Sequence, residues 1–331
     1  MKHLSTGRRW AALFLLAAPL AAPGWGGRLH MDISRAAARA VPEEMAGWRE
    51  YAKFMASHSI QPDLWKGFDS TEDTRHFIDL ESYAPLTATN LPLDQAAVPA
   101  TPGEKSKAHG YAPWVIMDLQ AKLTSAMASS QWVEAARIAA AQGHYVGDIH
   151  QPLHTTENYD GQHSGQGGVH LRWEVAMPNV HWRIGMMPEV HAGYLSNVWP
   201  SVLGWVEQSH SRIPEVFAAD DKAARQAEFN VESRAYYFHL WQASSNLFIE
   251  QTHLAACHLA SLWYTAWVDA GRPEIAPPPE TLTEASIWKP ASPAGEHASW
   301  PFLVAFGVIA LAIILLSLRR RPAPPVKSRP L

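Results

Sequence analysis

One stretch indicates the fold class most directly. Residues 135–154 read AARIAAAQGHYVGDIHQPLH, with apolar side chains recurring at three- and four-residue intervals and alanine predominating in the first half. That spacing is the period of an α-helix with a buried face, and alanine is the strongest helix former. Proline cannot continue a helix, so we expect this helix to end before Pro152 and the chain to turn there.

The same helical spacing recurs over most of the chain, in residues 29–40, 43–56, 113–128 and 223–268. Alternating apolar and polar residues are scarce, and only 169–184 is compatible with a short β segment. The sequence therefore predicts an all-α fold, with a single multi-helix domain over residues 25–272. Two tryptophans of the last helix, Trp263 and Trp267, share one helical face and are expected in the core.

The first 24 residues have the pattern of a secretory signal peptide. Arg8 and Arg9 precede an apolar run over 10–22, and small residues stand ahead of a cleavage point after Gly24. Cleavage there would make Trp25 the new N-terminus. An uncleaved membrane anchor is the alternative interpretation.

A second apolar run predicts a transmembrane helix near the C-terminus. Residues 299–318 carry no charge, and at about 1.5 Å per residue their helix would nearly match a hydrocarbon core of roughly 30 Å. The basic tail, 319–331, would then lie in the cytoplasm. The proline-rich segment 273–298 predicts an extended linker. We therefore expect a single-pass protein whose folded domain lies on the extracytoplasmic face of the cytoplasmic membrane.

Charge and cysteine content argue against nonspecific duplex binding and against stabilisation by an internal disulfide. The formal net charge of −4 argues against a protein that coats duplex nucleic acid without specificity, because such binding needs a basic surface. Cys257 is the only cysteine, so an exported chain cannot form an internal disulfide. Its fold must be stabilised by the core or by bound metals.

Two histidine–carboxylate pairs lie close together in the sequence. His144 and Asp148 are four residues apart in the predicted helix, so both face one side within reach of one ion. His170 and Glu174 repeat the spacing, and His154 lies between the pairs. Imidazole and carboxylate ligands suit zinc at an extracytoplasmic hydrolytic site. One such pair alone could be a helical ion pair of little energetic value, but two pairs and a third histidine favour a metal centre.

These motifs resemble those of the zinc-dependent phospholipases C and the related single-strand-specific zinc nucleases. GHYVGDIHQPLH at 143–154 and GVHLRWE at 168–174 carry the resemblance, which covers most of residues 25–272. It implies a mature chain that begins with a zinc-binding tryptophan, followed by a histidine and, before the central motif, by an aspartate and a histidine. The residues that match these positions are Trp25, His30, Asp63 and His76. For the aspartate, Asp69, Asp73 and Asp79 remain nearby alternatives.

The resemblance implies an all-helical domain of that type with three zinc ions (Zn2+) per chain. One ion would bind Asp63, His76, His144 and Asp148. A second would bind His154, His170 and Glu174. The third would bind the backbone of Trp25, with His30 and Asp148, so that Asp148 bridges two ions.

Clustered zinc predicts hydrolysis of a phosphate ester by a metal-bound hydroxide, because such ions lower the pKa of bound water to about 7. The catalytic candidates are Asp63 and Asp148, with Asp63 expected to orient or deprotonate the water. No protein partner is predicted.

The substrate is less well determined than the reaction. Glu174 in place of aspartate, and the short gap between His154 and His170, are similar to the phospholipase branch, whereas the spacing of Trp25 and His30 is similar to the nuclease branch. We prefer a phospholipase C-like phosphodiesterase acting on phospholipid. The alternatives are a single-strand-specific endonuclease or nucleotidase, and a non-catalytic, zinc-stabilised surface module that binds a partner.

Overall fold

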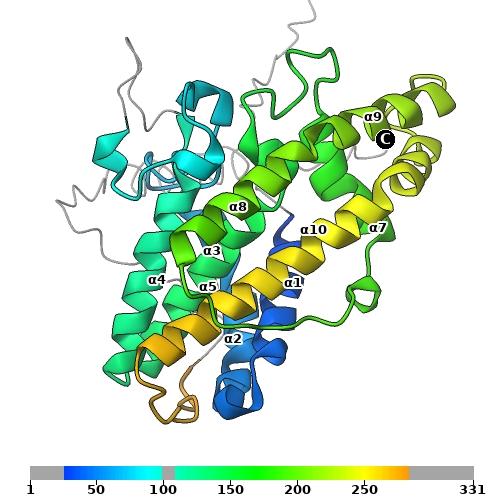
Figure 1. Ribbon diagram of the computed structural model, residues 1–331. Coiled ribbons are helices and arrows are strands. Elements are labelled where there is room, and N and C mark those ends of the chain that lie inside the picture. Colours follow the sequence, from blue (N-terminus) through cyan, green and yellow to red (C-terminus); the bar gives the residue numbers. More distant parts are fainter. Residues whose placement is uncertain (1–25, 99–108, 283–331) are drawn as a thin grey trace, which may run out of the picture. The chain divides into compact units, whose positions relative to one another are not determined.

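The computed structural model describes residues 26–98 and 109–282, all within one compact unit of the chain (Figure 1). The predicted signal peptide, transmembrane helix and basic tail lie outside these residues, and the predicted linker lies outside them beyond residue 282. No helix in the described ranges is long and apolar enough to cross a membrane.

All regular elements of the described residues are helices, and these residues contain no β-strand, which confirms the predicted all-α class. Six longer helices form the body: α1 (Gly27–Ala40), α4 (Ala112–Ala128), α5 (Trp132–Ile149), α8 (Val198–Ser211), α9 (Ile213–Gln226) and α10 (Arg234–Asp269). Shorter α-helices are α2 (Ala52–His58), α3 (Gln61–Trp65), α6 (Val169–Leu171) and α7 (Met177–His181). Between them lie the 3-10 helices η1 (Glu43–Tyr51), η2 (Asp73–Arg75), η3 (Leu80–Tyr83), η4 (Ala88–Asn90), η5 (Gln95–Ala97), η7 (Pro152–Thr155) and η9 (Ile184–Met186), and a π-helical turn, η8 (Arg172–Ala176).

Helix α5 is the centre of the fold. It packs against α1, α2, α4 and α10, and its side chains are buried on nearly every face (Figure 1). Alanines and glycines make this possible because they let neighbouring helices approach closely. A Cβ added at Gly143 would lie only 2.7 Å from the hydroxyl oxygen of Ser34 on α1. The composition of α5 therefore brings α1 against the part of the helix that carries the His144 motif.

Aromatic packing joins this centre to the long helix α10. Trp263 is fully buried, and its ring lies 6.2 Å from that of Trp48, whose ring in turn lies 6.4 Å from Trp132 at the start of α5. Trp267 is also buried, so both tryptophans of α10 are core residues, as predicted. Edge-to-face pairs of this kind stabilise a core beyond their apolar area alone.

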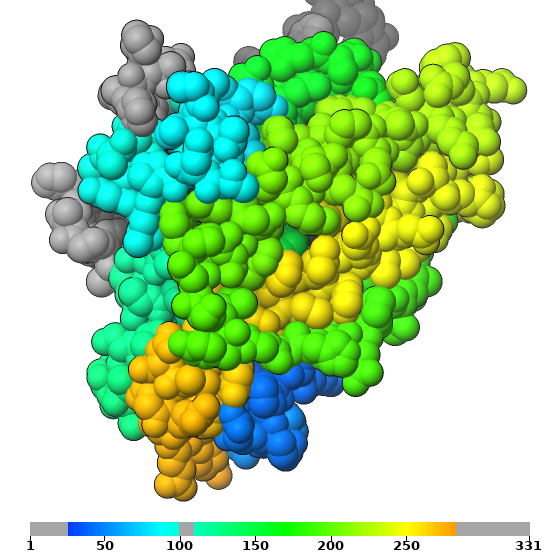
Figure 2. Space-filling view, viewed as in Figure 1, coloured from blue at the N-terminus to red at the C-terminus, as the bar shows by residue number. Residues whose placement is uncertain are grey.

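A long segment without regular structure crosses α10. Between η9 and α8 the chain runs beside the C-terminal half of α10, where the amide of Gly193 donates to the Ser261 hydroxyl (3.1 Å) and that of Leu195 to the Thr265 hydroxyl (2.9 Å). In Figure 2 it forms a green band below the yellow surface of α10. Side-chain hydroxyls of α10 thus accept hydrogen bonds from backbone amides of a segment that belongs to no helix or strand.

The structure corrects one local prediction and divides another predicted helical stretch. Residues 169–184 are not a β segment but the succession α6, η8, α7 and the first residue of η9. The helical spacing predicted over residues 223–268 belongs to two helices: α9 ends at Gln226, and Glu228 and Phe229 have positive φ values of 53° and 61°. Ser233 then begins α10 by accepting a hydrogen bond from the amide of Tyr236 (3.1 Å).

Candidate metal centre

The predicted ligands come together from seven elements of the fold. Helix α5 supplies His144 and Asp148 one turn apart, on the same face, as expected. It ends at Ile149, before Pro152, and the following 3-10 turn carries His154. The remaining predicted ligands with described positions are His30 on α1, Asp63 on α3, His76 directly after η2, His170 on α6 and Glu174 on η8. These side chains are buried or nearly so.

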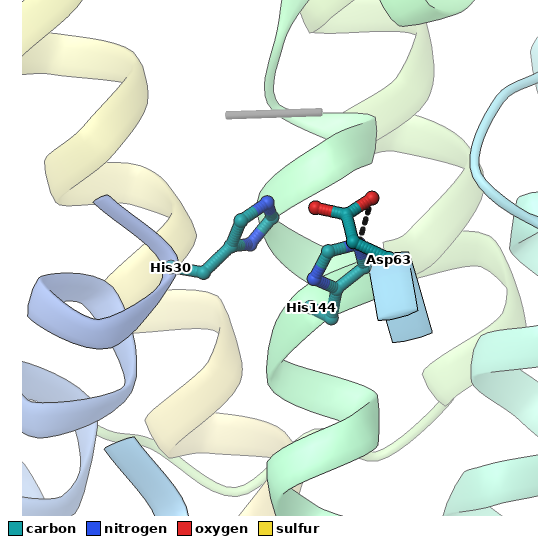
Figure 3. A group of neighbouring side chains, drawn as sticks. All are labelled: His30, Asp63 and His144. Carbon is teal, nitrogen blue, oxygen red and sulfur yellow. Dashed lines mark ion pairs between the residues drawn. The ribbon is translucent and has the colours of Figure 1, made fainter. Parts of the chain in front are cut away.

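The first group surrounds Nε2 of His144. This atom lies 3.0 Å from Nδ1 of His76, 3.4 Å from Oδ2 of Asp148 and 3.6 Å from Oδ1 of Asp63. Asp148 Oδ2 is also 3.0 Å from Nδ1 of His76. The four side chains therefore point at one small volume, which agrees with the predicted first zinc site. Figure 3 shows the Asp63 carboxylate directed at His144. The structure thus places Asp63, among the four aspartates considered, in contact with this group.

Hydrogen bonds to carbonyl groups show which nitrogens of the histidines are available. Nδ1 of His144 is 2.8 Å from the carbonyl oxygen of Ser59, and Nδ1 of His154 is 2.9 Å from that of His76. A carbonyl oxygen only accepts, so both Nδ1 atoms must donate. In the neutral imidazole this leaves Nε2 with a lone pair directed into the cluster, which is the arrangement typical of metal-binding histidines.

The second group lies on the other side of Asp148. Nε2 of His170 is 2.5 Å from Oε2 of Glu174, and Nε2 of His154 is 3.5 Å from the same oxygen and 3.3 Å from Nε2 of His170. Gln151 donates to that Oε2 (3.1 Å) and fixes the carboxylate. These three side chains form a potential metal-binding group, as the sequence predicted for the second ion.

Asp148 connects the two groups and also reaches His30. Its Oδ1 lies 3.6 Å from Nδ1 of His154 and 3.5 Å from Nε2 of His30. The ring of His30 stacks on that of His144, with centroids 3.9 Å apart (Figure 3). His30 also forms a potential metal-binding group with Asp63 and His144. The position of Asp148 therefore agrees with a carboxylate that bridges two ions.

Trp25, the remaining predicted ligand, lies outside the described residues. Its neighbour Gly26 lines the same small cavity as Glu174, and a Cβ added at Gly26 would lie 3.4 Å from a methyl group of Val175. The beginning of α1 is therefore next to the centre.

Charge and hydrogen bonding in the centre fit divalent cations. Burial by itself raises the pKa of Asp148, but His144, His154 and His76 hold it well below its usual range. Burial lowers the pKa of His154, but Asp148 and Glu174 raise it to about 9. The buried carboxylates thus require positive charge beside them, from protons or from metal ions.

Several buried polar atoms of the centre have no hydrogen-bond partner within the described part of the chain. They are both ring nitrogens of His30, Oδ1 of Asp148 and Oε1 of Glu174. Buried polar groups are nearly always satisfied in folded proteins, so unsatisfied acceptors that converge on one volume indicate ligand positions. The donor set, imidazole nitrogen with carboxylate oxygen, is that of zinc.

Lys66 is a residue of the centre that the sequence analysis missed. Its Nζ lies 2.9 Å from Oδ1 of Asp63. Burial lowers the pKa of Lys66, but Asp63 and Asp148 raise it above its usual value, so the ammonium stays charged. The spacing of three residues from Asp63 across a short helix was a usable signal for this pair.

The family follows from this geometry together with a sequence comparison. A model of the S1/P1 nucleases matches residues 27–270, which includes every described residue of the centre. The chain belongs to the S1/P1 nuclease family. Members are zinc-dependent phosphoester hydrolases, so the protein is an enzyme of that class, and the non-catalytic alternative is not supported. No curated protein matches the chain. Membership of this family favours the nuclease, which was the alternative, over the phospholipase C-like enzyme that the sequence analysis preferred.

Proposed function

We propose that the protein is a nuclease that hydrolyses phosphodiester bonds of single-stranded nucleic acid at a centre of three zinc ions. The observation that carries the proposal is the convergence of eight described side chains on Asp148 and its neighbours. Membership of the S1/P1 nuclease family supports nucleic acid rather than phospholipid as the substrate.

The proposed ligands follow the predicted grouping. Asp63, His76, His144 and Asp148 would hold one ion, and His154, His170 and Glu174 a second. His30 and Asp148 would hold the third together with the backbone of Trp25. Zinc at such sites polarises phosphoryl oxygens and lowers the pKa of bound water to about 7.

The chain's own side chains have separate roles in this proposal. Asp63, held ionised by His144, Lys66 and His76 against the effect of burial, accepts a hydrogen bond and orients a water molecule. Its low pKa makes it a weak proton acceptor at neutral pH, so we assign it orientation rather than deprotonation. Lys66 supplies a fixed positive charge for a nonbridging oxygen of the phosphate.

A substrate comparison tests the proposal. The purified chain, loaded with zinc, is offered single-stranded DNA, single-stranded RNA, duplex DNA and phosphatidylcholine vesicles, each with and without a chelator. We expect cleavage of the single strands, loss of that cleavage on metal removal, and recovery when zinc is returned. Release of the phosphorylated headgroup without cleavage of nucleic acid would replace this proposal with the phospholipase C alternative. Asp148→Asn serves as the inactive control.

We also propose that the enzyme is exported and tethered by its C-terminal apolar segment, on the strength of the sequence patterns at residues 1–24 and 299–318. N-terminal sequencing and membrane fractionation test this. A mature chain that begins with Trp25 and stays with the membrane after a salt wash is the expected result. A chain that retains Met1, or one released by salt, would contradict it.

A further inference from the structure

Arg172 lies between two proposed zinc ligands but faces away from them. It follows His170 by two residues and precedes Glu174 by two. Residues two apart on a helix do not share a face. The Arg172 side chain is nevertheless buried, so its charge must be balanced inside the protein.

The guanidinium group joins three parts of the fold. Nη1 donates to the carbonyl oxygen of Gly167 (2.8 Å) and Nη2 to that of Gln166 (3.1 Å). Nη2 also donates to Oδ1 of Asp220 on α9 (2.9 Å), and Nε donates to the hydroxyl of Tyr236 on α10 (2.9 Å). We call Gln166, Arg172, Asp220 and Tyr236 the Arg172 network.

The other members bind one another as well. The Tyr236 hydroxyl donates to Oδ1 of Asp220, and the amide of Gln166 donates to Oδ2 of Asp220 (3.0 Å) and to the carbonyl oxygen of Phe217 (2.9 Å). Asp220 and Tyr236 are buried. A buried, fully hydrogen-bonded ionic network is rigid, and replacement of one member leaves the others unsatisfied.

The loop held by this network, residues 157–168, lies against His170. The carboxylate of Asp160 accepts hydrogen bonds from the amides of Gly168 (3.0 Å) and His170 (3.3 Å), and the Tyr159 ring lies edge-on to that of His170 with centroids 5.7 Å apart. Gly168 has φ of 85°, and a Cβ there would lie 2.8 Å from Nη1 of Arg172. The backbone before His170 is thus shaped around the guanidinium.

The network also supports the π-helical turn that carries Glu174. Such turns are rare and usually occur singly, often at functional sites, because their hydrogen bonding is less favourable than that of an α-helix. If η8 changed to α-helical winding, Glu174 would rotate relative to His170. Arg172, the first residue of η8, is fixed to α9 and α10 and opposes that change.

We propose that the Arg172 network is a positioning device for the His154–His170–Glu174 metal site. It fixes the loop on one side of His170 and the π-helical turn on the other, and so sets the zinc affinity of this one site. The inference rests on the proposed metal centre. Arg172 itself contacts neither metal nor substrate and is a positioning residue.

Stepwise zinc binding to the full-length chain tests the proposal without reference to turnover. His170→Ala identifies the binding step that belongs to this site. We expect Arg172→Lys, which keeps the charge but loses the forked donors, to weaken that same step about 10-fold or more and leave the other steps within about two-fold. Tyr236→Phe removes one hydroxyl of the network and should also weaken this zinc-binding step. It tests the proposal even if Arg172→Lys does not fold.

Arg212→Lys is the matched control. Arg212 bridges Glu215 and Glu250, at 2.7 Å and 3.0 Å, so it also links α9 with α10 but has no role in the network. We expect it to leave all zinc-binding steps unchanged, whatever it does to the melting temperature of the metal-free chain. Unchanged zinc binding in Arg172→Lys and Tyr236→Phe, beside an altered His170→Ala, would overturn this inference alone. If His170→Ala also bound zinc as the wild type does, the assignment of the metal site would fail with it.

Discussion

Nζ of Lys66 lies 2.9 Å from Oδ1 of Asp63, one turn further along α3 and its cap, and only 15 % of the Lys66 side chain is exposed. A buried ammonium at this position does more than balance Asp63. It adds a fixed positive charge at the edge of a centre built from three carboxylates. This relationship leads to the first of four predictions.

Lys66→Met should lower kcat on single-stranded DNA by about 10²–10³-fold, the effect typical of removing one preorganised charge or donor from a reacting oxygen. Zinc content should remain that of the wild type, because Lys66 is not a ligand. Steady-state rates and metal analysis check both. Lys122→Met is the control, since Lys122 pairs with Asp118 at 2.7 Å on the exposed face of α4. Loss of zinc in Lys66→Met would show that the residue maintains the site rather than contacts substrate.

Gly147→Ala should weaken zinc binding although no ligand is changed. A Cβ there would lie 2.8 Å from Nδ1 of His30, so the imidazole must move away from Asp148. We expect one zinc ion per chain to become easily removed by a chelator, with affinity at least about 10-fold lower. Gly204→Ala in α8 is the matched control, because its Cβ would meet nothing within 4 Å and should stabilise the helix by about 0.5–1 kcal/mol. Equal zinc retention in the two variants would argue against a ligand role for His30.

Asp148→Asn should disable more of the centre than any other single change. The amide keeps the size of the carboxylate but removes the charge that faces His30, His76, His144 and His154. We expect loss of more than one zinc ion and a fall in rate of about 10³-fold or more, corresponding to several kcal/mol of transition-state stabilisation. Metal analysis and rate measurement test this, with the exposed Asp118→Asn as control. Retention of full zinc content would contradict the bridging role.

The stability of the fold should depend on pH through His258. Burial, followed by the neighbouring His150 and His253, lowers the pKa of His258 far below 6.5, the ordinary value of a histidine. His258 lies 2.7 Å from Nε2 of His150 and stacks on Trp205 at 4.2 Å. The unfolded chain therefore binds more protons than the folded chain below about pH 6.5, so stability is highest above this pH and is lost as the pH falls.

Replacement of His258 by asparagine tests whether this residue lowers the stability of the fold as the pH falls. The asparagine amide takes the place of Nδ1 but does not titrate. Between pH 7.5 and pH 5 the free energy of unfolding should fall less in the variant than in the wild type, by at most about 2 kcal/mol. Urea unfolding at the two pH values measures the difference. Zinc release at low pH affects both chains alike, so identical pH dependence in both would refute the prediction.

The sequence was most informative where structure is local. The four-residue spacing of His144 and Asp148, and of His170 and Glu174, places each pair together through the helical period alone. The end of α5 before Pro152 was also predictable, because proline lacks the backbone amide that an α-helix needs. The β segment expected at 169–184 failed because a short apolar run does not distinguish strand from helix, and here the Arg172 network and α10 support a π-helical turn.

Long-range contacts could not be predicted in this way. His76 and Asp148 are 72 residues apart, and the choice of Asp63 among neighbouring aspartates depends on how α3 docks beside α5. Only the resemblance to a family identified these ligands from sequence. The resemblance did not indicate the roles of Lys66 and Arg172, which follow from contacts with residues elsewhere in the fold.

By itself, the sequence determined the helical class, the two histidine–carboxylate pairs and the turn that presents His154, because each depends on backbone geometry within a few residues. The tertiary structure decided which acid joins them, which histidine nitrogens face inward, where Lys66 adds its charge and how Arg172 holds the second site. These features depend on how helices far apart in the chain pack against one another. The alanines and glycines of α5 allow neighbouring helices to approach closely, so that His30 and Asp63 reach the same small volume as Asp148.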